Sequence, residues 1–261
     1  MKIKEVISFL DATFHPEYQE DYDNAGFLMG DGNADYRGAL VALDLTPAVV
    51  DEAVALGLNL IVTHHPFIFS GIKRITDSSE TGRMVLRMAR ENIAVYAAHT
   101  NLDNMSDGVN GILAEKLGLT GCRILKPFDN DPTLGAGMVG TLPSAVTAEQ
   151  FLQHCKSVLH LPVIRCSAHD SQQPVHRVAI CGGSGSFLIG DAIRAKADIY
   201  LTADMKYHDF QRAESRIILA DIGHYESEQF AKELIYCAIS KKISNFACRI
   251  SDSQQGLVLY I

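Results

Sequence analysis

Apolar and polar positions alternate along the chain in the rhythm of short strands and amphipathic helices. Near the N-terminus, apolar residues recur at helical spacing and predict one helix with a buried face: Ile3, Val6, Ile7, Leu10 and Phe14. Further along, we expect a strand at 37–45, a helix from Pro47 to Gly57 with Thr46 as N-cap, a strand at 58–63, a helix at 82–92, a strand at 93–98 and a helix capped by Ser106 that runs to Leu117. The expected strands are continuous apolar runs, so both of their faces should be buried. This pattern favours parallel sheets between helix layers, an α/β fold.

Proline and glycine residues interrupt this rhythm between Lys126 and Ala145, where Pro127, Pro132 and Pro143 lie. Such a composition is typical of a connection between compact parts of a chain. We therefore expect a first α/β lobe at 1–125 and a second at 126–261, with interleaving of the lobes left open.

The second half repeats the order of elements seen in the first. Each half gives a strand, a turn, a helix and another strand, followed by a threonine and polar residues. In both halves a histidine directly follows a strand and precedes an acid by four positions: His99 and Asp103, then His224 and Glu228. The match predicts an internal duplication, with two related lobes in pseudo-twofold relation and ligands from both. It is not symmetric, because Ala203-Asp204 stands where the first half has His64-His65.

Composition narrows the class of protein. The 261 residues are 47% hydrophobic, but no run approaches the roughly 18 apolar residues of a membrane span. The N-terminus lacks a signal-peptide pattern, and the 6 cysteines form no CxxC pair, which favours a reducing cytoplasm. A net charge of −8 disfavours broad binding to nucleic acid or to an anionic membrane.

Imidazoles and carboxylates at strand ends are typical ligands of divalent metals. On a regular strand His64 and His65 would point to opposite faces, so the pair suits two ions better than one. His224 and Glu228 lie one helical turn apart, and Asp103 has two oxygens that could bridge two ions. Taken singly, a strand-end histidine is more often a structural residue, and an i,i+4 pair is more often a solvated face. The joint occurrence of these groups favours a metal site.

Several motifs together resemble the NIF-three-like family, the GTP cyclohydrolase type 2 homologues. They are Thr63-His64-His65-Pro66, His99-Thr-Asn-Leu-Asp103, Gly223-His224-Tyr225-x-Ser227-Glu228, Tyr22-Asp23-Asn24-Ala25-Gly26, Leu134-Gly135-Ala136-Gly137, Gly182-Gly183-Ser184-Gly185 and Ala203-Asp204-Met205-Lys206-Tyr207-His208. The resemblance runs almost from end to end, without the middle domain of longer members. It implies two α/β lobes, a centre of two metal ions per chain in the cleft between them, and a toroidal homohexamer. By position it assigns as ligands His64, His65, Asp103, His224 and Glu228, with Asp103 as the bridging carboxylate.

Two classes of function fit these expectations. The first is a dinuclear metal-dependent hydrolase, in which a metal-activated water attacks a small nucleotide-like or heterocyclic substrate. His99, His208 and Asp204 are the candidates for a proton relay, and Asp204 with His208 fits equally well as a hydrogen-bonded pair of the cleft wall. The second is a non-catalytic ring protein that handles metal or acts as an interaction scaffold. The histidine-rich ligand set favours zinc, iron or manganese over magnesium and calcium. A ring that clamps nucleic acid would need a basic lining, which the net charge does not indicate.

Two glycine-rich stretches invite a nucleotide interpretation. Residues 135–140 match GxGxxG but lead into an expected strand instead of a helix, so we reject a dinucleotide fingerprint. Residues 181–186 lie between an expected strand and a helix, where backbone amides could bind an anion or simply form a tight turn.

Overall fold

A computed structural model describes residues 1–253 and 256–261 of the chain. The chain forms two compact units, each of which is made of two separate stretches of sequence. The first comprises residues 1–102 and the described part of 231–255, and the second comprises residues 103–230 with 256–261. Within the described residues, none of the helices combines the length and apolar character that crossing a membrane requires.

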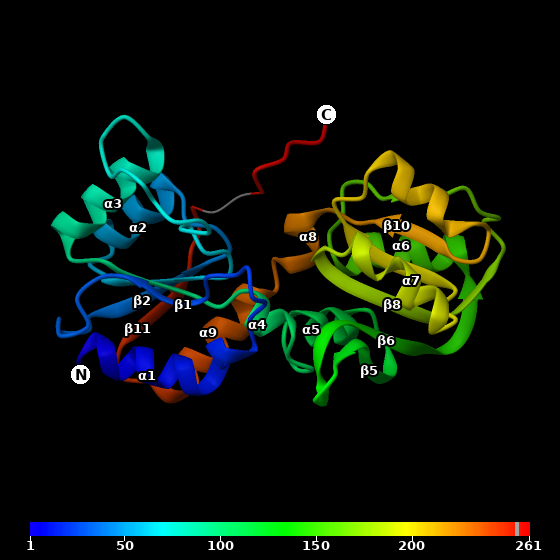
Figure 1. The fold of residues 1–261 in the computed structure, drawn as a ribbon, viewed down its shortest axis with the longest axis horizontal. Helices are drawn as coiled ribbons and strands as arrows, with labels where there is room; N and C mark the ends of the chain where they lie inside the picture. The colour runs from blue at the N-terminus through cyan, green and yellow to red at the C-terminus, as the bar shows by residue number, and fades with distance from the viewer. Residues whose placement is uncertain (254–255) are drawn as a thin grey trace. The chain divides into compact units, whose positions relative to one another are not determined.

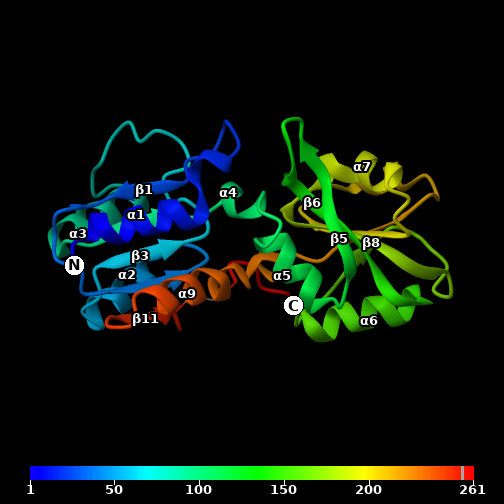
Figure 2. The ribbon, with the colours of Figure 1, turned by 90° about the horizontal axis from the view of Figure 1, so that it is seen from below.

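The first unit is a sheet between two helix layers (Figures 1 and 2). Its strand order is β1 (Gly26–Met29), β4 (Ala94–Ala97), β3 (Leu60–Thr63), β2 (Gly38–Ala42) and β11 (Ala247–Ile250). All of these neighbours pair in parallel except β1 with β4. The covering helices are α2 (Pro47–Ala55) and α3 (Glu80–Glu91) on one face, with α1 (Ile3–Phe14) and α9 (Ala231–Lys242) on the other.

The register of the first sheet determines where the polar residues that follow its strands lie. Ala42 pairs with Thr63, and Thr63 pairs with Ala97, so β2, β3 and β4 end level with one another. The residues that follow these three strands therefore gather at one carboxyl edge. That edge is where open parallel sheets place their ligands.

The second unit contains a mixed sheet. Its strand order is β5 (Thr120–Phe128), β6 (Asp131–Thr147), β8 (Pro174–Ser184), β9 (Ile199–Ala203), β10 (Ile218–Asp221) and β7 (Arg165–Cys166). Only the central β8, β9 and β10 of these described strands pair in parallel. The expectation of mostly parallel sheets thus holds for the first unit and for the centre of the second.

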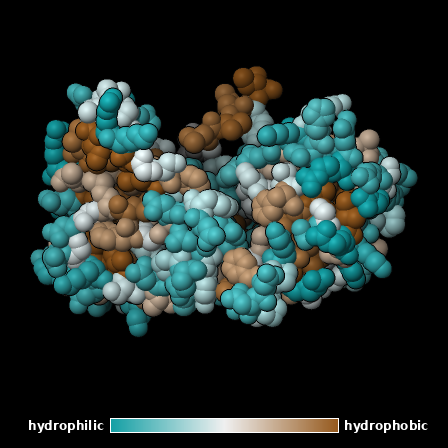
Figure 3. All heavy atoms as spheres, in the orientation of Figure 1, coloured by the Kyte–Doolittle hydropathy of each residue, from teal (hydrophilic) through white to brown (hydrophobic). Residues whose placement is uncertain are grey.

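Alternate side chains of the central strands pack into two hydrophobic cores, one on each face of the second sheet. Ile180 and Leu201 pack with Leu113 of α5 (Val109–Lys116) and Phe151 of α6 (Ala148–Val158). The intervening residues, such as Tyr200, pack with α7 (Ile189–Arg194) on the other face. This division is the period of two that a strand imposes on its side chains. Residues 257–261 carry exposed side chains, and the segment is mostly brown in Figure 3.

The structure corrects three local expectations. The segment between Lys126 and Ala145 is not a connection between units, because it belongs to the β5–β6 hairpin. Pro127 is tolerated there since β5 is an edge strand. The helix expected to start at Ser106 begins at Val109, with Gly108 as N-cap. The helical run after His224 is divided into α8 (His224–Glu228) and α9.

The two parallel cores repeat one another with a one-residue offset. Leu60 pairs with Ala94 in the first unit, and Ile199 pairs with Ile218 in the second. Counted from these pairs, His224 lies one residue further along than His99. The additional residue is Gly223, whose φ of 83° suits glycine in a tight turn.

Candidate metal centre

The chain bends sharply as β3 ends, and this bend sets the direction of two histidines. The strand stops at Thr63, whose buried hydroxyl donates a 2.8 Å hydrogen bond to the carbonyl of His65. The rings of His64 and His65 then lie with their centroids 5.0 Å apart. The rings do not point to opposite faces as they would on a regular strand, because the strand ends at Thr63 and the chain bends at His64 and His65.

His99 follows β4 and joins this pair. Its ring centroid lies 5.3 Å from that of His64 and 5.5 Å from that of His65. Each of the three rings offers a nitrogen, and these nitrogens lie within 4.8 Å of one another. The first unit thus brings together three imidazoles in a group that could hold a metal ion.

All three imidazoles are anchored through Nδ1. The acceptors are the Ala98 carbonyl oxygen for His64 (2.7 Å), Oδ1 of Asp44 for His65 (2.7 Å) and Oδ1 of Asp23 for His99 (2.8 Å). A carbonyl or ionised carboxylate oxygen only accepts, so each Nδ1 carries a hydrogen, and in the neutral imidazole Nε2 then carries the lone pair. Histidine ligands of metals are commonly oriented in this way.

Neither of these aspartates is among the ligands or proton-relay residues expected from the sequence. Asp44 comes two residues after β2, at the same sheet edge as His65, so its strand-end position was the available signal. Asp23 belongs to a loop before β1 and was noted only as part of a family motif. Its side chain is fully buried and also accepts hydrogen bonds from the amide and hydroxyl of Thr100. Burial alone would raise the pKa of Asp23, but the hydrogen bonds from His99 and Thr100 outweigh it and lower the pKa to about 2.

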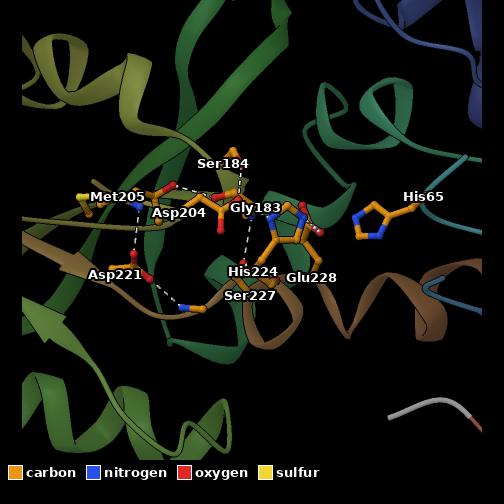
Figure 4. A network of polar contacts seen from close by, with 12 residues as sticks. His65, Gly183, Ser184, Asp204, Met205, Asp221, His224, Ser227 and Glu228 are labelled. Carbon is orange, nitrogen blue, oxygen red and sulfur yellow. Dashed lines mark hydrogen bonds and ion pairs between the residues drawn. The ribbon is translucent and has the colours of Figure 1, made fainter. Parts of the chain in front are cut away.

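In the second unit, α8 presents His224 and Glu228 on one face, as their spacing predicts (Figure 4). Nε2 of His224 lies 3.0 Å from Oε2 of Glu228, and Nδ1 lies 2.7 Å from Oδ2 of Asp204. Burial lowers the pKa of His224, but the two carboxylates outweigh that effect and raise it to about 9. The ring of His224 thus lies between two carboxylates, whose negative charges favour a positive charge at this position.

Gly183 of β8 packs directly against Glu228 (Figure 4). Its φ is +60°, and an added Cβ would lie 2.1 Å from Oε1 of Glu228. Its amide donates a 2.9 Å hydrogen bond to Oγ of Ser227. Glycine is therefore required here both for the backbone conformation and for the approach of the carboxylate.

Asp103 lies near the same end of β8. Burial raises the pKa of the neighbouring Cys181 to about 12, and the charges of Asp103 and Glu228 add to this effect. The second unit thus gathers three of the expected ligands, Asp103, His224 and Glu228, around one strand end.

The remaining candidates have different surroundings. His208 is exposed and its ring contacts Tyr207, with centroids 5.3 Å apart. Asp204 accepts hydrogen bonds from Ser184 and His224, which gives it an orienting role toward His224.

Two amides of the 181–186 turn, those of Gly182 and Gly183, are engaged within the protein. The amide of Gly182 donates to Oδ1 of Asn110 (3.0 Å), as that of Gly183 does to Ser227. These contacts favour the tight-turn interpretation over anion binding. Residues 135–140 all lie within β6, so they do not form the turn between a strand and a helix that a dinucleotide fingerprint requires.

Comparisons with known proteins place these motifs in a family. The model of the family described as Duf34/NIF3 (NGG1p interacting factor 3) matches residues 1–255. A "GTP cyclohydrolase 1 type 2 homolog" of Nostoc sp. is 37% identical and covers 88% of each chain, and one of Lactococcus lactis is 32% identical over 98% of this chain and 97% of its own. The crystal structure of Staphylococcus aureus protein SA1388 is 28% identical, covers 100% of this chain and 99% of its own, and has a TM-score of 0.90. The chain belongs to the Duf34/NIF3 family.

Proposed function

We propose that the chain is a dinuclear metal-dependent hydrolase with two divalent ions, zinc, iron or manganese, per chain. The proposed ligands are His64, His65, Asp103, His224 and Glu228. The observation that carries the proposal is the anchoring of ring Nδ1 atoms by acceptors, which leaves Nε2 of His64 and of His65 as the ligand atom. His224 is held in the same way by Asp204. A purely structural histidine needs a hydrogen-bond partner for only one of its ring nitrogens. When several neighbouring imidazoles are all anchored through Nδ1, their Nε2 atoms are suited to bind metal ions.

The donor set fits a transition metal or zinc, since imidazoles predominate and carboxylates complete the set. Such an ion, when bound, acidifies a coordinated water and polarises the bond to be hydrolysed. The protein's own residues orient the ligands and move protons. Asp204 fixes the ring of His224, and Asp23 fixes the ring of His99. In this proposal the His99–Asp23 pair can accept and return a proton.

The name of the relatives, GTP cyclohydrolase 1 type 2 homolog, supports a proposal for the substrate class. We propose a small nucleotide-like or heterocyclic compound as the substrate, and a toroidal homohexamer as the assembly. Light scattering of the purified protein tests the assembly directly.

Metal analysis tests the dinuclear site. The purified protein, reconstituted with Zn²⁺, should contain about two ions per chain. Asp103→Ala should lose about one ion or more, whereas Asp107→Ala, an exposed aspartate nearby, should lose none. A content of about one ion that Asp103→Ala leaves unchanged would exclude the bridging role.

Turnover tests the hydrolase. Metal-reconstituted protein is screened over nucleotides and over pterin and purine analogues, with His64→Ala/His65→Ala as the control. Turnover above that control supports the hydrolase. No turnover by a metal-loaded protein would favour the second function, a non-catalytic metal-binding ring protein.

A further inference from the structure

Two exposed aromatic side chains adjoin the imidazole of His99 in the first unit. Tyr22 is 65% exposed and Phe69 is 48% exposed. Their ring centroids lie 6.3 Å apart with the planes tilted by 49°. The ring of Phe69 also lies edge-to-face with that of His99, with centroids 6.1 Å apart. Three rings from the loop before β1, the loop after β3 and the segment after β4 therefore form one cluster.

The loop that carries Phe69 is held on both sides of the chain. Phe67 packs against the core of the first sheet, so it anchors the start of this loop. The side-chain amide of Asn24 donates a 2.6 Å hydrogen bond to the carbonyl of Ile68. Phe69 therefore follows two anchored residues while its own ring stays exposed. A ring that is already in position costs less to bind to than one that must first be ordered.

The segment 22–24 links the aromatic rings to His99. Its central residue, Asp23, accepts the hydrogen bond from Nδ1 of His99. The residues on either side of Asp23 contact the ring of Phe69 and the carbonyl of Ile68. One short stretch of chain therefore positions the exposed rings and also orients the imidazole that is proposed to accept a proton.

The size of the exposed aromatic surface suits a small planar molecule. A single exposed aromatic side chain is ordinary, but two in contact beside a candidate site form a surface that a ligand can cover. Phe and Tyr side chains carry about 150–250 Å² each, so the exposed parts of Tyr22 and Phe69 amount to roughly 200 Å². A stable contact between proteins needs about 800 Å² per partner. The area therefore favours one face of a planar ring over a protein partner.

We infer that Tyr22 and Phe69 form an aromatic platform on which a planar heteroaromatic ring stacks, with one edge turned toward His99. This inference rests on the proposed hydrolase, and it narrows the substrate to compounds that carry such a ring. Every nucleobase or pterin has a π face, and stacking on an aromatic side chain uses that face. The platform binds and orients the ring, while the His99–Asp23 pair exchanges a proton at its edge.

A fluorescence experiment tests the contact directly. The chain contains 0 tryptophans, so Phe69→Trp introduces a single reporter. Titration with guanosine should quench its emission to a saturating level. The matched control is Phe246→Trp, because Phe246 also lies against a tyrosine, Tyr36, with ring centroids 5.0 Å apart. That pair precedes β11 and β2 at the opposite edge of the same sheet, so guanosine should cause no saturable quenching there.

Calorimetry with guanosine measures what each ring contributes in protein reconstituted with Zn²⁺. Phe69→Ala should raise the Kd by about 5- to 150-fold, the range observed when a stacking side chain is removed. Phe69→Leu should lose nearly as much, because leucine keeps an apolar side chain but has no π face. Phe69→Tyr should stay within about twofold of the wild type. Tyr22→Ala should raise the Kd by about fivefold or more, and Phe246→Leu should leave it unchanged.

Three results would overturn the platform. They are the absence of guanosine binding to the wild type at millimolar concentration, a wild-type Kd in Phe69→Ala, and equal quenching in the two tryptophan variants. Light scattering tests the other occupant of this surface, a second copy of the chain. A change of assembly in Phe69→Ala with an unchanged Kd for guanosine would assign the rings to that contact and would also overturn the platform.

The inference and the proposed function fail in different ways. Turnover with a KM that Phe69→Ala and Phe69→Leu leave unchanged would overturn the platform and leave the hydrolase standing. Guanosine binding that depends on the ring of Phe69, in protein with wild-type zinc content and no turnover, would support the platform and count against the hydrolase.

Discussion

Oδ2 of Asp204 lies 2.7 Å from Nδ1 of His224, at the carboxyl edge of the second sheet. This contact orients the ring of His224 and leaves Nε2 to face Glu228.

Replacing Asp204 should weaken metal binding. We expect Asp204→Ala to lower Zn²⁺ affinity by about 10- to 100-fold, because the ring of His224 loses its anchor. Asp204→Asn should lose less, since asparagine keeps an acceptor and tolerates the φ of 56°. Asp198→Asn serves as the control, because Asp198 accepts from backbone amides elsewhere in the same unit. Competition titration measures all three variants, and wild-type affinity in Asp204→Ala would contradict the orienting role.

Gly183→Ala should damage both stability and the site. Its Cβ would overlap Oε1 of Glu228, and its φ of +60° is strained for alanine. Gly121→Ala is a matched control, with a φ of +61° and nothing within 4 Å of its Cβ. We expect Gly121→Ala to cost about 1 kcal/mol of unfolding free energy and Gly183→Ala about 1–3 kcal/mol more. Urea denaturation of metal-free protein measures this difference, and equal costs would show that Glu228 moves aside freely.

Thr63→Val should loosen the paired histidines. Valine has nearly the same shape as threonine but cannot donate to the His65 carbonyl, so the bend after β3 loses its hydrogen bond. We expect Zn²⁺ affinity to fall by about 10-fold, since misplacement of both rings costs about 1 kcal/mol or more. Thr63→Ser keeps the hydroxyl and should bind like the wild type. Equal affinities of the valine and serine variants would mean that the bend does not depend on this bond.

Glu52 should contribute stability that depends on pH. Burial raises its pKa, but hydrogen bonds from Ser251 and from the amides of Asp252 and Ser253 outweigh burial and lower it below 4.5. A lowered pKa means that the stabilisation is present above the ordinary pKa and is lost as pH falls through the lowered one. Glu52→Gln should cost about 0.5 kcal/mol at pH 7, an amount that already allows for solvent screening. Chemical denaturation at a series of pH values checks this, and a difference that does not shrink in acid would contradict it.

Local signals predicted most of the elements but not all of the site. Thr46 accepts the amide of Val49 and caps α2 as expected, and α1 buries the predicted apolar face. The strand-end histidines could be singled out from the sequence because a histidine directly after an apolar run is a local pattern. The bend after Thr63 was missed, since it depends on a side-chain hydrogen bond that strand periodicity does not encode.

The partners of these histidines could not be predicted from local pattern because they come from distant parts of the chain. Asp23 is 76 residues away from His99, and Asp44 is 21 residues away from His65. Their pairing is decided by the order of β1, β4, β3 and β2 in the sheet. The placement of β11 beside β2 is similarly remote, so the division of the chain into units was not available from composition.

The first unit is made of two stretches that are distant in sequence, and this has a consequence for its folding during synthesis on the ribosome. Ala247 of β11 pairs with Gly38 of β2, so the first sheet lacks this strand until residues 247–250 have emerged. The second unit is almost continuous, from Asp103 to Phe230, and all of its strands are made earlier. Domains generally fold in the order of their synthesis, and contacts distant in sequence form slowly. In this protein the part that begins first should therefore be the last to be completed.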